Sequence, residues 1–325
     1  MQGSKTAELQ SAESLLALMS IPTVGPVTAL KLARHFPTWD SLLGATEADR
    51  KQVGGTAGLA VAYRPEPPAY VNFPESSIRG YFDDDYPSAF ESLASPPAVI
   101  WMRGELSALP SVAVVGTRRP TPPGANLAEV VARDAVGAAA QVVSGLAKGV
   151  DVAAHRGCLD AGGTTVAVLG AGLDKVGSVA HQKLSDQIVN AGGVVITEQP
   201  PGTRADSGKL IARNRLQVAL SQAVVVVQSS LLGGTLETAR QALLQHRLLA
   251  CCPPATDDDP DAWAGNVALL DPQRFSLFPR ALARALLERG PAIRLDEGAG
   301  LAEVLSQATA TERTSGDPTP GPAVR

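Results

Sequence analysis

Six short apolar runs, separated by segments of helical pattern, constrain the fold of this chain more than any other feature. They are SVAVVG (111–116), QVVSG (141–145), TTVAVLG (164–170), GGVVITE (192–198), AVVVVQSS (223–230) and RLLACC (247–252). Runs of this length, spaced by roughly 25–30 residues with helical patterns between them, predict βαβ units and a parallel sheet covered on both faces. The sequence therefore predicts an α/β fold of the kind that binds nucleotides or nucleic acids.

The regions outside these runs suggest further parts of the chain. Residues 1–62 predict a small helical domain, in which two helical patterns are joined by the turn Pro22–Pro26, as in a SAM-like or helix-hairpin-helix element. The Pro-rich start of 63–82 predicts a linker in extended conformation. We expect the sheet domain over 83–285 and a tail over 286–325, partly disordered by composition and too short and polar for a winged helix.

The overall charge of −4 argues against a nucleic-acid ligand, because affinity for a phosphate backbone comes mainly from Lys and Arg. The distribution of charge argues otherwise. Residues 111–250 carry 13 Lys and Arg against 9 Asp and Glu, so the excess of acid lies elsewhere in the chain. A local cationic groove is compatible with an acidic protein.

Other features of the composition narrow the class of protein. We expect the three cysteines, Cys158, Cys251 and Cys252, to be reduced core residues, since the vicinal pair lies in a predicted buried strand. They form no metal site with the four scattered histidines, and we predict neither a metal nor a cofactor. The absence of a signal segment and of an 18-residue apolar run predicts a cytoplasmic protein without a membrane partner.

Small residues and cations follow several of the predicted strands. Ligands of open parallel sheets bind at the carboxyl ends of the strands, where the N–H groups of helix N-termini attract phosphate. In chain order these ends carry Gly116-Thr117-Arg118-Arg119, Ser144-Gly145-Leu146-Ala147-Lys148-Gly149, Gly170-Ala171-Gly172, Thr197-Glu198 and Gly233-Gly234-Thr235. We therefore expect one edge of the sheet to bind an anionic ligand.

Two clusters of cations favour phosphate as that ligand. Arg118 and Arg119 come directly after a strand, where two guanidinium groups beside free N–H donors form a phosphate clamp. In KLIARNRL, Lys209, Arg213 and Arg215 flank Asn214 in what we interpret as the start of a helix. Cations at a helix start oppose the macrodipole unless an anion is bound there, so this cluster also predicts binding.

Two further patterns carry less chemical meaning. Asp151 and His155 share a helix face at positions i and i+4, but no nucleophile accompanies them, so we expect capping and hydrogen bonding rather than acid–base catalysis. Gly170 and Gly172 do not form a dinucleotide fingerprint, because Lys175 stands where a third glycine is required. Lys183 follows on the next helix and either faces the same edge or is an ordinary exposed lysine.

Taken in order, six motifs resemble those of the DprA/Smf family of DNA-processing proteins. They are GTR, SGLAKGVDVAAHRG, VLGAGLD, ITEQPPG, ARNR and GGTLETARQA, and the resemblance covers roughly residues 8–255. It implies an extended Rossmann-like, doubly wound parallel sheet after a helical SAM-like domain. It also implies a homodimer that binds single-stranded DNA and helps to load RecA recombinase in natural transformation.

The resemblance also implies which residues form the binding site. The implied cations are Arg118, Lys148, Lys183, Lys209, Arg213 and Arg215. The implied lining residues are Gly116, Thr117, Ser144, Gly145 and Gly234. To these we add the neighbours Arg119, Asn214, Gly233 and Thr235. A channel that follows phosphates needs cations and backbone donors, so we predict no catalytic residue.

The chain departs from the family pattern at two places that affect binding. Gly177-Ser178 replaces a Tyr-Pro, with His181 in place of Asn, and Leu210-Ile211 replaces a Phe-Pro. Base stacking on aromatic side chains contributes about 1–3 kcal/mol per base. We therefore expect weaker, more phosphate-dominated binding than the family pattern implies.

Two alternative functions remain open at the level of sequence. GGTLET resembles the motif of nucleotide phosphoribohydrolases, but Thr238 occupies the position of the catalytic Glu, and Glu237 comes one residue early. One residue on a helix is a rotation of about 100°, so we expect Glu237 to point away from the site. The second alternative is a sensor that binds a small phosphorylated nucleotide without turning it over, because it needs the same glycines and cations.

Overall fold

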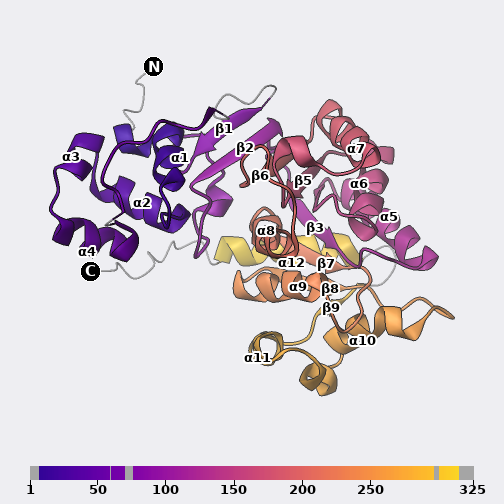
Figure 1. The fold of residues 1–325 in the computed structure, drawn as a ribbon. Helices are drawn as coiled ribbons and strands as arrows, with labels where there is room; N and C mark the ends of the chain where they lie inside the picture. The colour runs from indigo at the N-terminus through magenta and orange to yellow at the C-terminus, as the bar shows by residue number, and fades with distance from the viewer. Residues whose placement is uncertain (1–6, 59, 70–75, 296–299, 315–325) are drawn as a thin grey trace. The chain divides into compact units, whose positions relative to one another are not determined.

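A computed structural model describes residues 7–58, 60–69, 76–295 and 300–314. The chain divides into two compact units, each assembled from separate stretches of sequence (Figure 1). The first unit comprises Met1–Glu105, Leu169–Val189 and Val194–Arg213, and the second comprises Leu106–Val168, Asn190–Gly193 and Asn214–Arg325.

The first unit begins with a cluster of short helices, as the sequence predicts. The helices are η1 (Glu8–Gln10), α1 (Ala12–Ser20), α2 (Pro26–His35), α3 (Trp39–Leu43) and α4 (Glu47–Gly58). Ser11 caps α1, since its hydroxyl accepts from the Ser14 N–H at 3.2 Å. Leucines and Trp39 fill the space between the helices, and the Trp39 indole donates to the Ser14 hydroxyl at 3.3 Å. These helices form the small N-terminal core that the hydrophobic pattern predicts.

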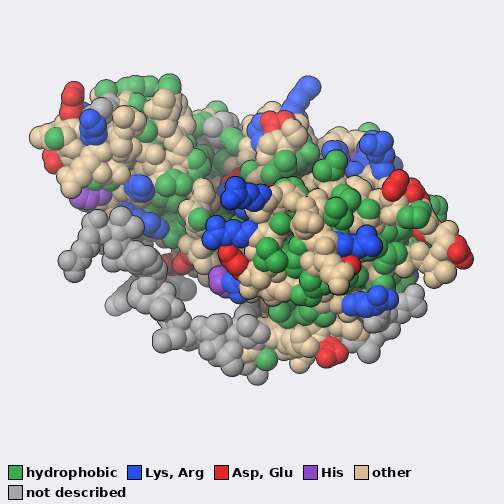
Figure 2. Space-filling model, turned by 90° about the horizontal axis from the view of Figure 1, so that it is seen from below, with side chains coloured by type: hydrophobic (Ala, Val, Ile, Leu, Met, Phe, Trp, Pro, Cys, Tyr) green, Lys and Arg blue, Asp and Glu red, His purple; other side chains and the backbone are tan. Residues whose placement is uncertain are grey.

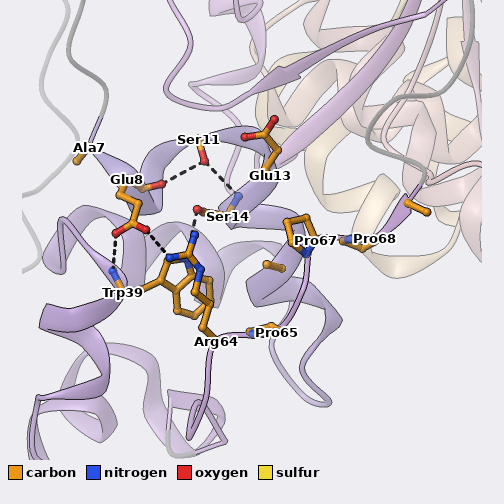
Figure 3. A pocket seen from close by; sticks show the side chains of 12 residues that line it. Ala7, Glu8, Ser11, Glu13, Ser14, Trp39, Arg64, Pro65, Pro67 and Pro68 are labelled. Carbon is orange, nitrogen blue, oxygen red and sulfur yellow. Dashed lines mark hydrogen bonds and ion pairs between the residues drawn. The ribbon is translucent and has the colours of Figure 1, made fainter.

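The Pro-rich stretch after these helices packs back onto them (Figure 3). Arg64 forms an ion pair with Glu8 at 2.7 Å, and its guanidinium lies 5.8 Å from the centre of the Trp39 ring. The same Glu8 carboxylate accepts from the Trp39 backbone N–H at 3.2 Å. Together with the prolines that follow, these residues line a pocket of about 520 Å³. The first part of the predicted linker is therefore extended but attached to the helices.

The strands of the first unit are antiparallel neighbours. They are β1 (Ser77–Gly80), β2 (Val99–Gly104) and β6 (Val194–Thr197), with η3 (Ser88–Phe90), η4 (Leu173–Lys175) and α7 (Val179–Asn190) between or beside them. β2 pairs antiparallel with both β1 and β6. The apolar run at 192–198 forms the predicted strand β6, and its antiparallel neighbour β2 lies outside the six apolar runs for which the sequence predicts parallel pairing.

The second unit contains the predicted parallel sheet. Its strands are β3 (Ser111–Val115), β4 (Gln141–Ser144), β5 (Thr165–Leu169, of which Leu169 falls in the first unit), β7 (Ala223–Val226), β8 (Leu248–Cys251) and β9 (Ile293–Arg294). They lie in the order β5-β4-β3-β7-β8-β9, and every neighbouring pair is parallel. The Val-rich strands are buried on both faces, as expected for such a sheet.

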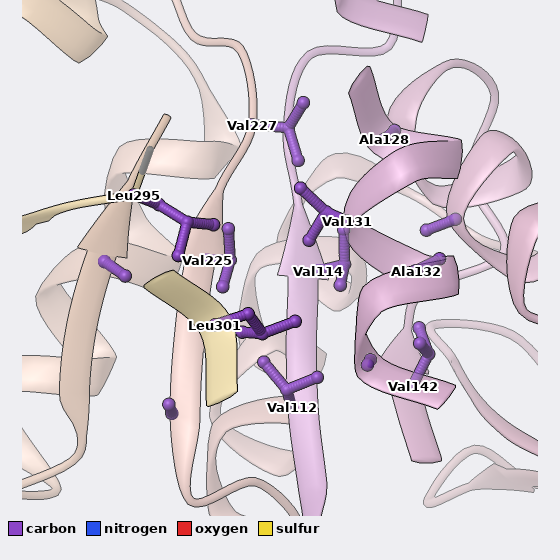
Figure 4. Close-up of a cluster of buried hydrophobic side chains, with 14 of the residues drawn as sticks. Val112, Val114, Ala128, Val131, Ala132, Val142, Val225, Val227, Leu295 and Leu301 are labelled. Carbon is purple, nitrogen blue, oxygen red and sulfur yellow. The ribbon is translucent and has the colours of Figure 1, made fainter. Parts of the chain in front are cut away.

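Helices cover both faces of this sheet. They are α5 (Pro122–Gly137), α6 (Val150–Asp160), α8 (Ser207–Ala219), α9 (Gly234–Leu244), η5 (Pro260–Trp263), α10 (Ala264–Leu270), η6 (Pro272–Leu277), α11 (Arg280–Arg289) and α12 (Gly300–Thr314). Val112 and Val114 of β3 pack with α5, α6 and α12 (Figure 4), whereas Ala113 and Val115 pack with α9, α10 and α11. This alternation, expected for a strand buried on both faces, gives the second unit two apolar layers.

The end of the sheet domain differs from the prediction. Residues 286–314, which composition assigns to a tail, include the end of α11, the strand β9 paired with β8, and the helix α12. Leu301, Val304 and Leu305 of α12 are buried in the same layer as α5. Apolar residues at helical spacing within a polar stretch explain the error, because average composition hides such a stripe. The predicted disorder of 315–325 lies outside the described residues.

Replacement of Val304 by alanine tests whether α12 belongs to the folded core. Loss of two buried methyl groups should lower the free energy of unfolding by about 2 kcal/mol. For a unit of this size the midpoint of thermal unfolding should fall by about 4–8 °C, measured by circular dichroism. Glu303→Ala is the matched control on an exposed position of the same helix and should change the midpoint little. Equal effects of the two changes would contradict the burial of α12.

The three cysteines are buried and free, as predicted. Burial raises the pKa of Cys158 to about 11 and that of Cys252 to about 12, and the pKa of Cys251 also lies well above its ordinary value because of burial. Within the described residues, no helix combines the length and apolarity needed to cross a bilayer.

Candidate nucleic-acid interface

The order of strands in the second unit locates the candidate site. From β3 the chain builds the sheet towards β4 and β5, whereas β7, β8 and β9 extend it in the other direction. β3 and β7 pair side by side, so the order reverses between them. In open parallel sheets, ligands bind beyond the carboxyl ends of the strands at such a reversal. The residues after β3 and β7 include Arg118, Arg119, Gly233 and Gly234, where the sequence predicts anion binding.

The loop after β3, residues 117–121, presents two exposed cations. Arg118 and Arg119 are both exposed, and neither forms an ion pair with any residue that the structure describes. The Arg119 N–H donates to the Thr117 hydroxyl at 3.3 Å, which closes the turn between them. Because the two guanidinium groups have no ion-pair partner among the described residues, they are available to an external anion.

Gly116 and Gly149 let the loop after β4 lie against the 117–121 loop. A Cβ on Gly116 would lie 2.5 Å from a methyl group of Val150, and one on Gly149 would lie 2.4 Å from the Thr117 carbonyl oxygen. Gly149 has a φ of +88°, and the Val150 N–H after it donates to Thr117 at 3.2 Å. The exposed Lys148 is thereby held beside the 117–121 loop.

Ser144 and Gly145 do not line the surface of this site. Both residues are buried, and the Ser144 hydroxyl donates to the Val114 carbonyl oxygen at 2.7 Å. The Ser144 side chain thereby joins β4 to β3 instead. The cause is their position, since the last strand residues still lie within the two-sided core.

The start of α9 supplies the second part of the edge. Gly233, with a φ of +138°, and Gly234 are exposed, whereas Thr235 is buried. The Asn214 side chain donates to the Gly234 carbonyl oxygen at 3.2 Å, which joins α8 to α9. Arg215, one residue further along α8, is half-buried. The structure thus brings Asn214 to the predicted glycines, although in a supporting role.

The remaining predicted cations belong to the first unit. Lys183 is exposed on α7, Lys209 is half-buried on α8, and Arg213 is buried on α8. Lys209 forms an ion pair with Asp206, and hydrogen bonds from Lys209 lower the pKa of that carboxyl group. The Arg213 guanidinium donates to the Leu210 carbonyl oxygen at 3.5 Å.

The prediction of three cations at a helix start is wrong for two of them. α8 begins at Ser207, so Lys209 lies in its first turn but Arg213 and Arg215 lie further along. Asp206 is the signal that was missed, since its carboxylate accepts from the Lys209 backbone N–H at 2.8 Å in the manner of an N-cap. The macrodipole argument for a bound anion therefore applies to Lys209 alone, and Asp206 already pairs with it.

The positions that depart from the family pattern lie in different local surroundings. Ser178 precedes α7, and its hydroxyl lies 2.7 Å from Nδ1 of His181, while Gly177 has a φ of +116°. Leu210 lies in α8 next to Gly170, where a Cβ would be 3.1 Å from the Leu210 backbone. Ile211 is 47% exposed. The first unit therefore places aliphatic or small polar side chains at these positions.

Asp151 and His155 have the hydrogen-bonding roles that the sequence predicts. The Asp151 carboxylate accepts from the Ala147 N–H at 3.3 Å, before α6 begins. His155 is fully buried, with Nδ1 2.7 Å from the Thr165 hydroxyl of β5. Each side chain supports the backbone near it.

Glu237, the acid considered for a hydrolase, pairs within α9. Its carboxylate accepts from Arg240 at 2.6 Å and from Gln241 at 3.0 Å. Burial alone would raise the pKa of Glu237, but these hydrogen bonds outweigh it and the pKa is lowered. The Thr238 hydroxyl donates to Gly234 at 3.3 Å. A glutamate held in this ion pair is stabilised as the carboxylate and is engaged away from the glycine turn.

On the face drawn in Figure 2, the surface charge is local rather than continuous. Lys and Arg side chains form separate groups there, with hydrophobic and uncharged side chains between them. This pattern agrees with a chain of net charge −4 that is basic only over part of its length.

An open parallel sheet with cations and glycine turns at its strand reversal defines a Rossmann-like α/β protein suited to an anionic ligand. Residues 77–273 match the family model described as DNA recombination-mediator protein A. The chain therefore belongs to this family, the DprA/Smf family that its motifs resemble.

Individual relatives agree with this assignment. The chain is 31% identical to Protein Smf of Synechocystis sp. over 257 residues, 74% of this chain and 64% of the relative. It is 36% identical to DNA processing protein DprA of Streptococcus pneumoniae over 186 residues, 57% of this chain and 64% of the relative. The matches thus span less than two thirds of the length of these curated relatives.

Solved structures confirm the fold class. The crystal structure of DprA from Streptococcus pneumoniae superposes with a TM-score of 0.69 at 24% identity, covering 91% of this chain and 97% of that one. DprA from Helicobacter pylori, described for its single-stranded DNA binding mode, superposes with a TM-score of 0.54 at 25% identity, covering 74% of this chain and 97% of that one.

Proposed function

We propose that this chain binds single-stranded DNA through the loops beyond β3, β4 and β7 of the second unit. The observation that carries the proposal is the pair Arg118 and Arg119, exposed, without an ion-pair partner among the described residues, and attached beside Lys148 at the strand reversal. Phosphate binding needs cations and backbone donors on a fixed frame. The Helicobacter pylori relative, described as a single-stranded DNA binder, supports the choice of ligand.

The same proposal extends to the role of the protein in the cell. As a member of a recombination-mediator family, the chain would act without a catalytic residue in the cytoplasm. It would form a homodimer and help to load RecA on single strands during natural transformation. Lys183, Lys209 and Arg213 of the first unit remain predicted contributors to strand binding.

Strand binding is tested by fluorescence anisotropy with labelled oligo-dT and with a duplex of equal length, each at two salt concentrations. We expect tighter binding of the strand, with an affinity that falls as salt rises, because phosphate contacts release counterions. The logarithmic slope should be about −0.7 per phosphate contacted on a single strand. Full competition by one mononucleotide, with no dependence on strand length, would instead identify a nucleotide sensor.

The mediator step has its own measurement. The rate at which RecA assembles on oligo-dT coated with a single-strand-binding protein should rise when this chain is added. Light scattering with sedimentation measures the mass of the free protein. An unchanged assembly rate, with intact strand binding, would refute the mediator role alone, and a monomer at all concentrations would refute the dimer.

A further inference from the structure

The 117–121 loop is held at both ends by one residue, Gln228, which follows β7. The Thr117 N–H donates to the Gln228 carbonyl oxygen at 2.8 Å, and the Thr121 N–H donates to Oε1 of its side chain at 2.9 Å. Nε2 of Gln228 in turn donates to the Thr121 hydroxyl at 2.9 Å. Gln228 is fully buried. The loop that carries Arg118 and Arg119 is therefore fixed across the strand reversal by a side chain that an anion would not contact.

Asp258, Trp263 and Gly124 surround the hydrogen bonds between Gln228 and Thr121. The Thr121 hydroxyl donates to Oδ2 of Asp258, and the Trp263 indole donates to the same oxygen at 2.7 Å. Hydrogen bonds from Thr121 and Trp263 lower the pKa of Asp258, so it is held as the carboxylate. Gly124 leaves room for the amide, since a Cβ there would lie 2.3 Å from Oε1 of Gln228. Asp258 and Trp263 thus fix Thr121, and Thr121 and the space left by Gly124 orient the Gln228 amide.

We propose that Gln228 is the positioning residue of the strand-binding loop, acting on phosphate contacts through the 117–121 backbone. The inference rests on the proposed function, because it concerns how Arg118 and Arg119 are presented to a strand. A loop fixed before binding loses little conformational freedom when it binds, which increases affinity.

The side-chain amide of Gln228 can both accept and donate a hydrogen bond, and it does both at Thr121. Its N–H group donates to the Thr121 hydroxyl, which leaves the hydroxyl proton free to point at Asp258. A carboxylate at this position could not donate, so the hydroxyl would have two acceptors for one proton. With glutamine at position 228, the side chains of Gln228, Thr121 and Asp258 all form their hydrogen bonds at once, whereas with glutamate one acceptor would lack a donor.

A double-mutant cycle in the full-length chain tests the inference, with oligo-dT affinity as the readout. The changes are Gln228→Met and Arg118→Ala, alone and together. Gln228→Met removes both side-chain hydrogen bonds to the loop, and we expect it to weaken binding about tenfold. In its presence Arg118→Ala should cost much less than in the wild type, because the arginine is no longer held in place. A general loss of stability would leave the cost of Arg118→Ala unchanged.

Gln141→Met is the matched control. Gln141 is also a buried glutamine of the second unit, and its side chain donates to Ser107, Leu109 and Ser111 at the amino end of β4. We expect this change to lower the unfolding midpoint but to leave strand affinity and the effect of Arg118→Ala as in the wild type. If Gln228→Met does not fold, Thr121→Val replaces it in the cycle, since it keeps the backbone hydrogen bond and removes only the hydroxyl.

The outcomes separate the inference from the function on which it rests. Independent costs of the two changes, or equal coupling in the Gln141→Met background, would overturn the positioning role while strand binding stands. No binding of oligo-dT by the folded wild type would overturn the proposed function, and the inference with it.

Discussion

Arg118→Glu should weaken the binding of oligo-dT by roughly 10- to 150-fold at low salt, because hydrogen bonds to charged groups contribute about 1.5–3 kcal/mol. The reversal also places a negative charge next to Arg119 at the edge where phosphate is expected. The slope of log affinity against log salt should become shallower by at least about 0.7, the value for one lost phosphate contact on a single strand. Anisotropy titrations at several salt concentrations measure both effects.

Arg133→Glu is the matched control for this charge reversal. Arg133 lies near the end of α5, the helix that returns from the carboxyl edge of the sheet towards the start of β4, and it pairs only weakly with Glu129 at 3.7 Å. The net charge of the protein changes by the same amount in both variants. Equal losses of affinity would mean that overall charge, rather than the loop after β3, governs binding.

Gly149→Ala should lower both stability and strand affinity. The backbone at Gly149, with φ +88° and ψ −128°, lies in a region that alanine rarely adopts, which costs roughly 1–3 kcal/mol, and the new Cβ would lie 2.4 Å from the Thr117 carbonyl oxygen, adding roughly 1–3 kcal/mol. The midpoint of thermal unfolding should fall by about 5–15 °C. Because the 117–121 loop must move to make room, strand affinity should also fall, by about tenfold or more.

Gly162→Ala separates backbone strain from the contact with the loop. Gly162 also has a positive φ, +75°, but a Cβ there would have no atom within 4 Å. This variant should show the strain alone, about 1–2 kcal/mol, with strand affinity unchanged. A loss of affinity as large as that of Gly149→Ala would show that general destabilisation, not displacement of the loop, is responsible.

The sheet could be predicted from sequence because its strands are buried on both faces. Each Val-rich run needs no partner information to be recognised, since burial on two sides requires an unbroken apolar stretch. β1 and β9 escaped prediction for the opposite reason. Ser77–Gly80 and Ile293–Arg294 are short and partly polar, and only pairing with β2 and β8 makes them strands.

The cations of the candidate site could be predicted because they directly follow predicted strands in the sequence. Arg118 and Lys148 follow strands, and strand ends meet at one edge. Ser144 shows the limit of that reasoning, since the residue type is compatible with ligand contact and its burial depends on neighbouring strands. Gln228 shows it more strongly, because its importance depends on hydrogen bonds to residues more than a hundred positions away. No local pattern reports such contacts.

The adjacent cysteines Cys251 and Cys252, at the end of β8, allow opening of the sheet to be measured. Cys251 and Cys252 side chains enter opposite apolar layers, and burial keeps both thiols protonated at neutral pH. Alkylating reagents attack the exposed thiolate, so the folded chain should resist them. The rate of labelling then measures how often both layers separate from the strand, without any added probe. Ligands that bind only the folded chain should slow that rate in proportion to occupancy.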